Sequence, residues 1–386
     1  MSGANSVALT GLLNSSNALN GVANNIANAE TVGFKKKTSS FANLVGGSQF
    51  GSGTTIADVR TDFTQGGRKT SGRVLDMMID GNGYFMVSAQ GSQQTTYTRN
   101  GEFSLDDQGN LVNIQGLRVQ GFEQNASGQY PLNPTDIQIP RNFNTPQVTS
   151  TVNADINLMA GGSNFSTSVS VYDSLGAENT AEISFTPTGT PNQWSVSYTV
   201  DGTTHTPTPA NVDFTPTGAI VGAPVHSINL PAFSNGAAAQ TVDFDLSAMT
   251  QFDGSNKVNG LVSDGYGIGS LEGIEITTDG IINARYSNGQ SLQDYRIGLV
   301  TFPNEDGLSD IGQGNFVAGV DAGARSLSFA GQNGLGNIVS SALEGSNVDL
   351  TTELVDLIQY QKAYRANAKT ITTSNQLTET TLNLDR

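Results

Sequence analysis

The side chains that most often carry catalysis or bind metal ions are scarce in this chain. Its 386 residues include no cysteine and two histidines, His205 and His226. The lack of cysteine excludes disulfides, zinc–thiolate sites and thiol nucleophiles. Both histidines lie in a stretch rich in Pro and Thr, so we expect each to occupy a surface or loop position. We therefore predict that the chain is not an enzyme and has no catalytic residue, no metal site and no cofactor.

Three short segments resemble ligand-binding motifs, but each has a simpler interpretation. Residues 265–269 (GYGIG) are glycine-rich like a phosphate loop, but they lack its lysine and the helix that follows it. Residues 106–110 (DDQGN) begin like a calcium loop without its sixth-position glycine and distal glutamate, so a hairpin turn is favoured. Residues 35–37 are three lysines beside a turn. We interpret them as a solvated linker and not as a nucleic-acid-binding patch.

Charge divides the chain into three parts. The net charge is −16, and residues 1–141 are neutral, with ten basic and ten acidic side chains. Residues 142–284 hold one basic and 13 acidic side chains, a net charge of −12, and residues 285–386 hold seven basic and 11 acidic side chains, a net charge of −4. This change of composition predicts an inserted domain between two segments that fold together; the alternative is an acidic patch on one continuous domain. An acidic surface disfavours nucleic acid and anionic membranes as partners.

Alternating apolar and polar residues predict that the acidic part is all-β. Residues 194–200 (WSVSYTV) alternate over seven positions, the period of a half-buried strand, and residues 169–172 and 183–185 repeat the pattern. Turns that contain Pro and Gly separate these runs, as in a β-sandwich or barrel.

The two ends of the chain have a helical pattern instead. Apolar residues recur at spacings of three and four, which is a weak heptad seam padded with Ser, Ala, Asn and Thr. Because such helices are marginal in water, they need a partner. They could pair with each other, or stay disordered in the monomer and fold on contact with copies of the chain, and the periodicity does not decide between these alternatives. The predicted seam residues are Leu9, Leu12, Leu19, Ala23 and Ile26 near one end, and Leu350, Leu354, Leu357, Tyr364, Ala368, Ile371 and Leu382 near the other.

Several motifs at both ends resemble those of the flagellar rod and hook axial proteins. Residues 24–36 (NNIANAETVGFKK) resemble the family's N-terminal motif, and residues 342–350 (ALEGSNVDL) resemble its C-terminal motif. Residues 99–103 (RNGEF) resemble a motif of its β-rich core. The motif residues on which we place most weight are Asn25, Asn28, Gly33, Phe34, Asn347 and Asp349.

The resemblance implies a mainly β, discontinuous multidomain protein with terminal α-helices. Residues 1–28 and 347–386 would be coiled-coil helices of an inner tube, and residues 29–70 a linker. Residues 71–146 and 261–346 would form a β-rich middle domain, and residues 147–260 an acidic, sandwich- or barrel-like outer domain. The length and the acidic insert match the hook-type members of the family.

The implied function is structural. Such a chain would polymerise with itself into a flexible tube that transmits torque from the basal-body rod to the filament. Its other partners would be the hook cap, the distal rod protein, the hook–filament junction protein and the flagellar type III export apparatus, with no nucleic acid and no membrane. We expect an extracellular location on the flagellum, reached without a Sec signal, which the N-terminal residues lack. The alternatives are a rod protein and a secreted β-rich adhesin.

Overall fold

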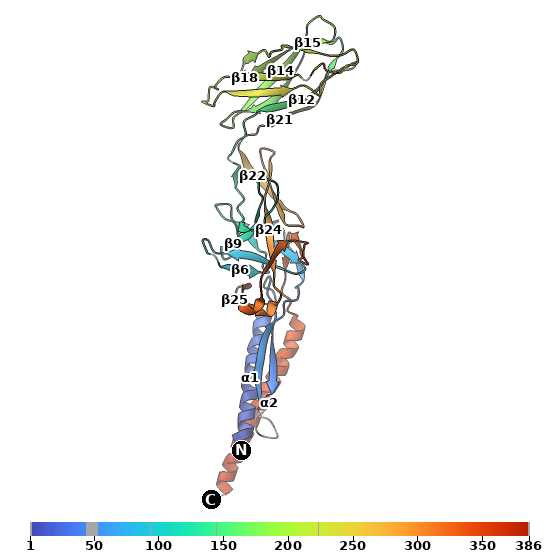
Figure 1. Ribbon diagram of the computed structural model, residues 1–386. Helices are drawn as coiled ribbons and strands as arrows, with labels where there is room; N and C mark the ends of the chain where they lie inside the picture. The colour runs from blue at the N-terminus through green and yellow to red at the C-terminus, as the bar shows by residue number, and fades with distance from the viewer. Residues whose placement is uncertain (1, 44–52, 93, 144, 223, 385–386) are drawn as a thin grey trace. The chain divides into compact units, whose positions relative to one another are not determined.

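The computed structural model describes residues 2–43, 53–92, 94–143, 145–222 and 224–384, with side chains between residues 5 and 380 apart from Phe143. The chain divides into two compact units. Unit 1 consists of residues 1–140, 274–284 and 291–386, and unit 2 of residues 141–273 and 285–290. The expected fold class is confirmed, because helices occupy the two ends of the chain and strands dominate between them (Figure 1).

The terminal helices are α1 (Ser2–Ala27) and α2 (Leu350–Leu384). α2 contains no Gly or Pro, and it begins where predicted, because the Thr352 backbone N–H donates to the Asp349 carboxylate at 2.7 Å as in an N-cap. The two helices pack side by side and run antiparallel, since Asn25 contacts Glu353 and Asn5 contacts Asn375 (Figure 1). Neither helix, in the part of the chain that the structure describes, is long and apolar enough to cross a membrane.

Unit 1 is built on the main part of a sheet with the order β24-β9-β5-β6-β26-β25. β1 and β2 form a separate antiparallel hairpin, and β3 and β4 pair with β29 and β28. The strands of unit 1 are β1 (Lys37–Asn43), β2 (Thr54–Thr61), β3 (Arg68–Thr70), β4 (Met77–Asp80), β5 (Tyr84–Ser88), β6 (Thr95–Thr98), β7 (Phe103–Leu105), β8 (Leu111–Asn113), β9 (Arg118–Glu123), β10 (Pro134–Asp136), β24 (Ser291–Thr301), β25 (Leu308–Gly312), β26 (Asn315–Ala318), β27 (Ser326–Phe329), β28 (Asn337–Ser340) and β29 (Ala342–Glu344). β22 (Gly269–Ile276) and β23 (Ile281–Tyr286) extend the same sheet and contain two of the four points at which the chain passes between the units.

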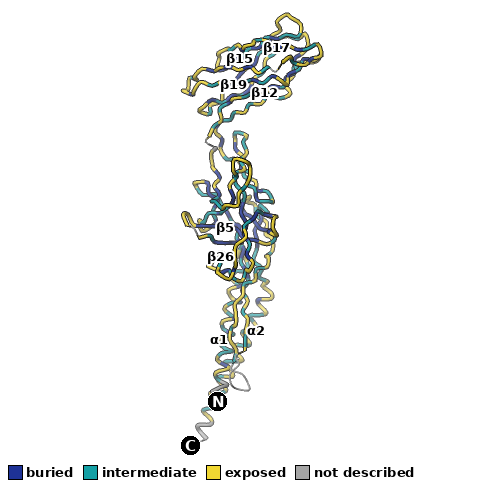
Figure 2. Tube along the Cα trace, viewed as in Figure 1, coloured by how far each residue is buried: buried dark blue, intermediate teal, exposed yellow. Residues whose placement is uncertain are grey.

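The core of unit 1 lies around β5, whose five residues are all buried. Tyr84 and Met86 pack there with Phe122 of β9, Val300 of β24 and Phe316 of β26. Burying large apolar side chains contributes about 1.5–3 kcal/mol each, so this cluster stabilises the unit. The terminal helices differ from this core, since most of their residues are exposed or half-buried (Figure 2).

Unit 2 has two five-stranded sheets that share one core of buried apolar side chains. The first sheet has the order β18-β19-β12-β20 with β21 beside β12, and the second has the order β13-β14-β15-β16 with β17 beside β15. The strands of unit 2 are β11 (Asn142–Phe143), β12 (Thr151–Met159), β13 (Phe165–Tyr172), β14 (Glu178–Pro187), β15 (Gln193–Val200), β16 (Thr203–His205), β17 (Asn211–Asp213), β18 (Val225–Leu230), β19 (Gln240–Asp245), β20 (Thr250–Phe252) and β21 (Lys257–Ser263).

Two segments, residues 194–200 and 29–70, form strands. The alternation over residues 194–200 predicted a strand, and β15 confirms it, with Trp194, Val196 and Tyr198 buried and the serines between them half-buried. Residues 29–70, predicted as a linker, contain β1, β2 and β3 instead, and residues 44–52 of that segment lie outside the described residues. The segment forms strands because β1 and β2 pack on α1, which covers one side of the hairpin.

The prediction that His226 lies on the surface or in a loop is wrong. It is fully buried in β18, and it faces the core because residues 226, 228 and 230 alternate with exposed positions along that strand. His205 ends the short strand β16 and is half-buried. The Pro/Thr-rich composition around both residues concealed the alternation of β18.

Candidate functional site

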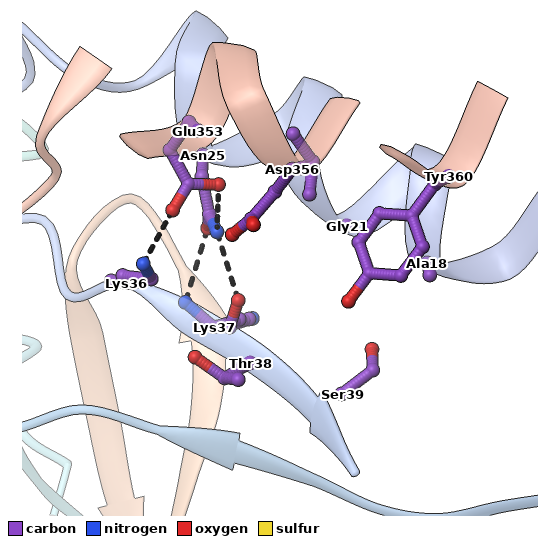
Figure 3. Close-up of a pocket in the computed structure, with 11 residues that line it drawn as sticks. Ala18, Gly21, Asn25, Lys36, Lys37, Thr38, Ser39, Glu353, Asp356 and Tyr360 are labelled. Carbon is purple, nitrogen blue, oxygen red and sulfur yellow. Dashed lines mark hydrogen bonds and ion pairs between the residues drawn. The ribbon is translucent and has the colours of Figure 1, made fainter. Parts of the chain in front are cut away.

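A polar cluster joins the end of α1, the start of β1 and the first turn of α2. The side chain of Asn25 lies at its centre and is almost fully buried. Asn25 Nδ2 donates to the Lys37 carbonyl at 2.8 Å and to Glu353 Oε2 at 3.1 Å, and the Lys37 backbone N–H donates to Asn25 Oδ1 at 3.0 Å (Figure 3). One asparagine amide is therefore hydrogen-bonded to a strand and to a helix at the same time.

The charge of the buried Glu353 carboxylate is balanced by a lysine. Lys36 Nζ lies 2.6 Å from Glu353 Oε1, and this hydrogen bond raises the pKa of the Lys36 ammonium (Figure 3). A cavity of about 40 Å³ beside the pair is lined by Ala18, Gly21 and Tyr360 among others. The cavity has room for about one water molecule and is too small for an organic ligand. The cluster thus serves as a structural joint.

A second, deeper cluster is organised by Glu344, at the end of β29. Its Oε1 accepts from Lys35 Nζ at 2.6 Å and from the Gly66 backbone N–H at 3.0 Å, and its Oε2 accepts from Arg99 Nη1 at 3.3 Å. All three charged side chains are almost fully buried. Lys35 Nζ also donates to the Thr64 carbonyl at 2.7 Å. One carboxylate therefore ties together four segments that are far apart in the sequence.

The electrostatics of this second cluster are those of a buried ion-pair network. Burial lowers the pKa of Lys35, and the neighbouring Glu344 carboxylate opposes that effect. The Arg99 guanidinium lies over the Tyr84 ring, 5.0 Å from its centroid, which adds a cation–π contact. Because a buried charge without a partner is costly, each member of the network needs the others.

The remaining family-motif residues lie around the two clusters. The backbone N–H of Gly33 donates to the Glu344 carbonyl at 2.8 Å, and Gly33 has φ +69°, where a Cβ would lie 2.7 Å from the Asn100 nitrogen. Asn347 Oδ1 accepts from the Lys36 backbone N–H at 2.8 Å, and its Nδ2 donates to the Asp62 carbonyl at 2.8 Å.

Two more motif residues lie at the end of α1. Asn28 Nδ2 donates to the Asn24 carbonyl at 2.9 Å, and its Oδ1 accepts from the Thr31 hydroxyl at 3.1 Å, which closes the last turn. Phe34 is half-buried and lines a pocket with Asn28 and Thr31.

The interpretation of residues 35–37 as a solvated linker is wrong. Lys35 is buried, Lys36 pairs with Glu353, and Lys37 Nζ lies 2.7 Å from Asp310 Oδ2. The run of three lysines gave no indication of these partners, because two of the three carboxylates lie more than 300 residues further along the chain. Glu344 and Arg99 were likewise missed as site residues, although both occur in the family motifs.

The predicted seam on α1 is displaced by one residue from the face that meets α2. The buried positions of α1 are Ala8, Ser15, Ala18, Val22 and Asn25, which have heptad spacing but small or polar side chains. Of the predicted seam, Leu12, Leu19 and Ile26 are half-buried at the edge of this face, whereas Leu9 is 50% exposed and Ala23 is exposed.

The physical reason is the close approach of the two helices. A Cβ at Gly11 would lie 2.8 Å from Asn367 Nδ2, and apart from Val22 the buried positions of α1 carry small or polar side chains, so the leucines lie beside this face. The spacing of the leucines therefore indicates the apolar stripe of α1 and not the face that meets α2.

The same displacement occurs on α2. Leu350, Leu354 and Tyr364 are exposed, Leu354 to 51%, whereas Leu357, Ala368 and Ile371 are half-buried. The side chain of Leu382 lies outside the described residues. Further apolar side chains of both helices are also exposed, namely Val7, Leu13, Val355, Ile358 and Leu377. Pairing of the helices within one chain thus leaves an apolar surface on each of them.

The other motif-like segments have no ligand-binding geometry. Residues 106–110 form the predicted turn between β7 and β8, and the Asp106 carboxylate accepts from the backbone N–H groups of Gln108 and Asn110. Residues 265–269 lead into strand β22, and no helix follows them. Among the residues that the structure describes, no group of three or more His, Asp or Glu side chains is arranged to hold a metal ion.

Models of known protein families match the segments that contain the motif residues of the two polar clusters. The model of the family described as "Flagella basal body rod protein" matches residues 6–35, and "Flagellar basal body rod FlgEFG protein C-terminal" matches residues 339–384. "Flagellar hook protein FlgE/F/G D1 domain" matches residues 78–155, and "Flagellar basal body protein FlaE D2 domain" matches residues 142–266.

Relatives match over nearly the whole chain. Flagellar hook protein FlgE of Escherichia coli K12 is 36% identical over 405 residues, which cover 98% of this chain and 99% of that protein. The chain belongs to the flagellar hook protein family. Hook protein FlgE of Treponema pallidum is 31% identical, with 98% of each chain covered. The crystal structure of Helicobacter pylori flagellar hook protein FlgE2 covers 72% of this chain with a TM-score of 0.50 and 16% identity, which shows a shared fold.

Proposed function

We propose that this hook protein polymerises through the exposed apolar faces of α1 and α2. The observation that carries the proposal is that α1 meets α2 mainly through small and polar side chains, while leucines such as Leu9 and Leu354 stay half-exposed. Exposed apolar stripes on monomers are unusual and are typical of interaction surfaces. Since the stripes on the two helices differ in sequence, contact between them would be heterologous, and such contacts build open helical polymers when the rotation between subunits does not close a ring.

In this proposal the chain is a structural subunit of the hook and has no catalytic role. The predicted seam residues of both helices would line the contacts between subunits in the inner tube. The two polar clusters would hold the helices to the β-rich part of unit 1, so that torque passes from one to the other. Unit 2, which carries half of the net charge of −16, would lie on the outside of the tube, where like charges keep neighbouring tubes apart.

The proposed partners follow from this role. The chain would contact copies of itself, the distal rod protein below, the hook–filament junction protein above, and the hook cap during growth. It would leave the cell through the flagellar type III export apparatus without a Sec signal and act outside the cell.

Removing residues 350–386 tests the proposal. We expect the shortened chain to remain unpolymerised while unit 2 stays folded, as reported by fluorescence of Trp194, which is buried in the core of that unit. Electron microscopy and sedimentation measure the polymer. Tubes formed by the shortened chain would contradict the assembly role of α2.

A further inference from the structure

The interior of unit 2 contains a titratable pair that the assembly role does not use. His226 of β18 is 0% exposed, and its Nδ1 lies 3.0 Å from the hydroxyl of Tyr198 on β15. β18 and β15 belong to different sheets, so this hydrogen bond crosses the core between them. The other ring nitrogen, Nε2, is buried and has no hydrogen-bond partner.

Apolar and aromatic groups surround the imidazole. Phe244 lies opposite His226 in the β18–β19 register, and its ring packs 4.3 Å from that of Tyr198, centroid to centroid. The Tyr198 and His226 rings meet edge to face at 6.0 Å. A protonated imidazole at this position would need an acceptor for Nε2, and these neighbours supply none.

The charged groups on the adjacent strands face away from the core. Asp243 and Asp245 of β19 alternate with the buried Val242 and Phe244, so they lie on the outer face of that sheet. Asp155 of β12 and Glu182 of β14 likewise alternate with buried residues of their strands. On these strands, as the structure describes them, no carboxylate faces His226. Tyr198 faces it, and His205 lies opposite Tyr198 in the β15–β16 register, on the same face of that sheet.

We propose that His226 makes unit 2 sensitive to acid: the two-sheet core folds only around the neutral imidazole, and protonation opens it. The device is independent of the terminal helices and of polymer formation. A fall in pH from 7 to 5 would therefore destabilise unit 2 of the hook subunit.

The direction follows from proton linkage. Burial lowers the pKa of His226. A histidine in an unfolded chain has a pKa of about 6.5, so below that pH the unfolded state binds a proton that the folded state excludes. Stability is then fully present above pH 6.5 and is lost as the pH falls. Between pH 7.5 and 5.5 the unfolding equilibrium constant of unit 2 should rise about tenfold.

The chain provides a selective reporter and a matched control. Trp194 is its single tryptophan and is buried in the same core as His226, so urea unfolding followed by tryptophan fluorescence reports unit 2 alone. His205 is its other histidine, and it is half-buried at the end of β16. We expect the tenfold change in the wild-type chain and in His205→Gln, and its loss in His226→Gln, whose amide keeps a neutral partner for Tyr198.

Nuclear magnetic resonance of the wild-type imidazoles provides a test that does not depend on a variant. We expect the His226 ring signals, assigned by comparison with His205→Gln, to stay in the neutral form down to pH 5.5 for as long as Trp194 remains buried. The proposal is overturned if His226 titrates near pH 6.5 in the folded chain. It is also overturned if His226→Gln keeps the pH dependence of the wild type.

Discussion

Replacing Glu344 with glutamine tests whether the deeper polar cluster holds unit 1 together. The substitution keeps the shape of the side chain, but it removes the one charge that Lys35 Nζ contacts at 2.6 Å and Arg99 Nη1 at 3.3 Å. It also places an amide N–H₂ where a cation or the Gly66 N–H now donates. Removing one partner of a buried ion pair costs about 3–5 kcal/mol, because the other charge stays buried. We expect Glu344→Gln to lower the free energy of unfolding of unit 1 by that amount.

Urea unfolding followed by circular dichroism at 222 nm measures this loss, since α1 and α2 both belong to unit 1. Glu30→Gln is the matched control, because Glu30 is exposed and lies 3.9 Å from Lys69, a surface pair worth about 0–1 kcal/mol. The Trp194 transition of unit 2 should not move in either variant. Adding Lys35→Met to Glu344→Gln should recover about 0.5–3 kcal/mol, because one unpaired charge is then removed. Equal stability of Glu344→Gln and Glu30→Gln would refute the reasoning.

Two further predictions concern the joint and the start of α2. Gly33→Ala should destabilise unit 1 by about 2 kcal/mol or more, because φ is +69° and the added Cβ would overlap the Asn100 backbone. Gly72→Ala, where a Cβ meets no atom within 4 Å, should have little effect in the same urea titration, and equal losses would contradict this explanation. The backbone N–H of Thr352 holds the pKa of Asp349 below its usual value. A carboxyl with a depressed pKa stabilises the fold above its unfolded pKa of about 4 and loses that effect as the pH falls. Helicity at 222 nm should therefore fall more steeply below pH 4 in the wild type than in Asp349→Asn; identical acid curves would show that the cap does not titrate with folding.

Local patterns in the sequence predicted the elements well. The strand at residues 194–200 and the long C-terminal helix follow from alternation and from the absence of Gly and Pro, and both are properties of neighbouring residues. The N-cap at Asp349 is equally local. These features depend on a few adjacent side chains, so one sequence is enough to find them.

The contacts between distant segments could not be found in this way. The face of α1 that meets α2 contains Gly11, Ser15 and Asn25, which no hydrophobic pattern selects, because these residues are small or polar. Lysine usually lies on the surface and histidine is intermediate, and the burial of Lys35 and His226 depends on partners in distant strands. Those partners are distant in the sequence and can be identified only from the three-dimensional structure.

The central claim is that exposed apolar residues of the terminal helices make the contacts between subunits. The most direct measurement is the polymer yield, by sedimentation and electron microscopy, of Leu354→Asn compared with Val262→Asn. Both side chains are exposed, Leu354 on α2 to 51% and Val262 on β21 of unit 2 to 64%, so neither substitution removes a core contact. We predict that Leu354→Asn abolishes or strongly reduces tube formation and that Val262→Asn assembles like the wild type. Equal polymer yields from the two variants would contradict the claim.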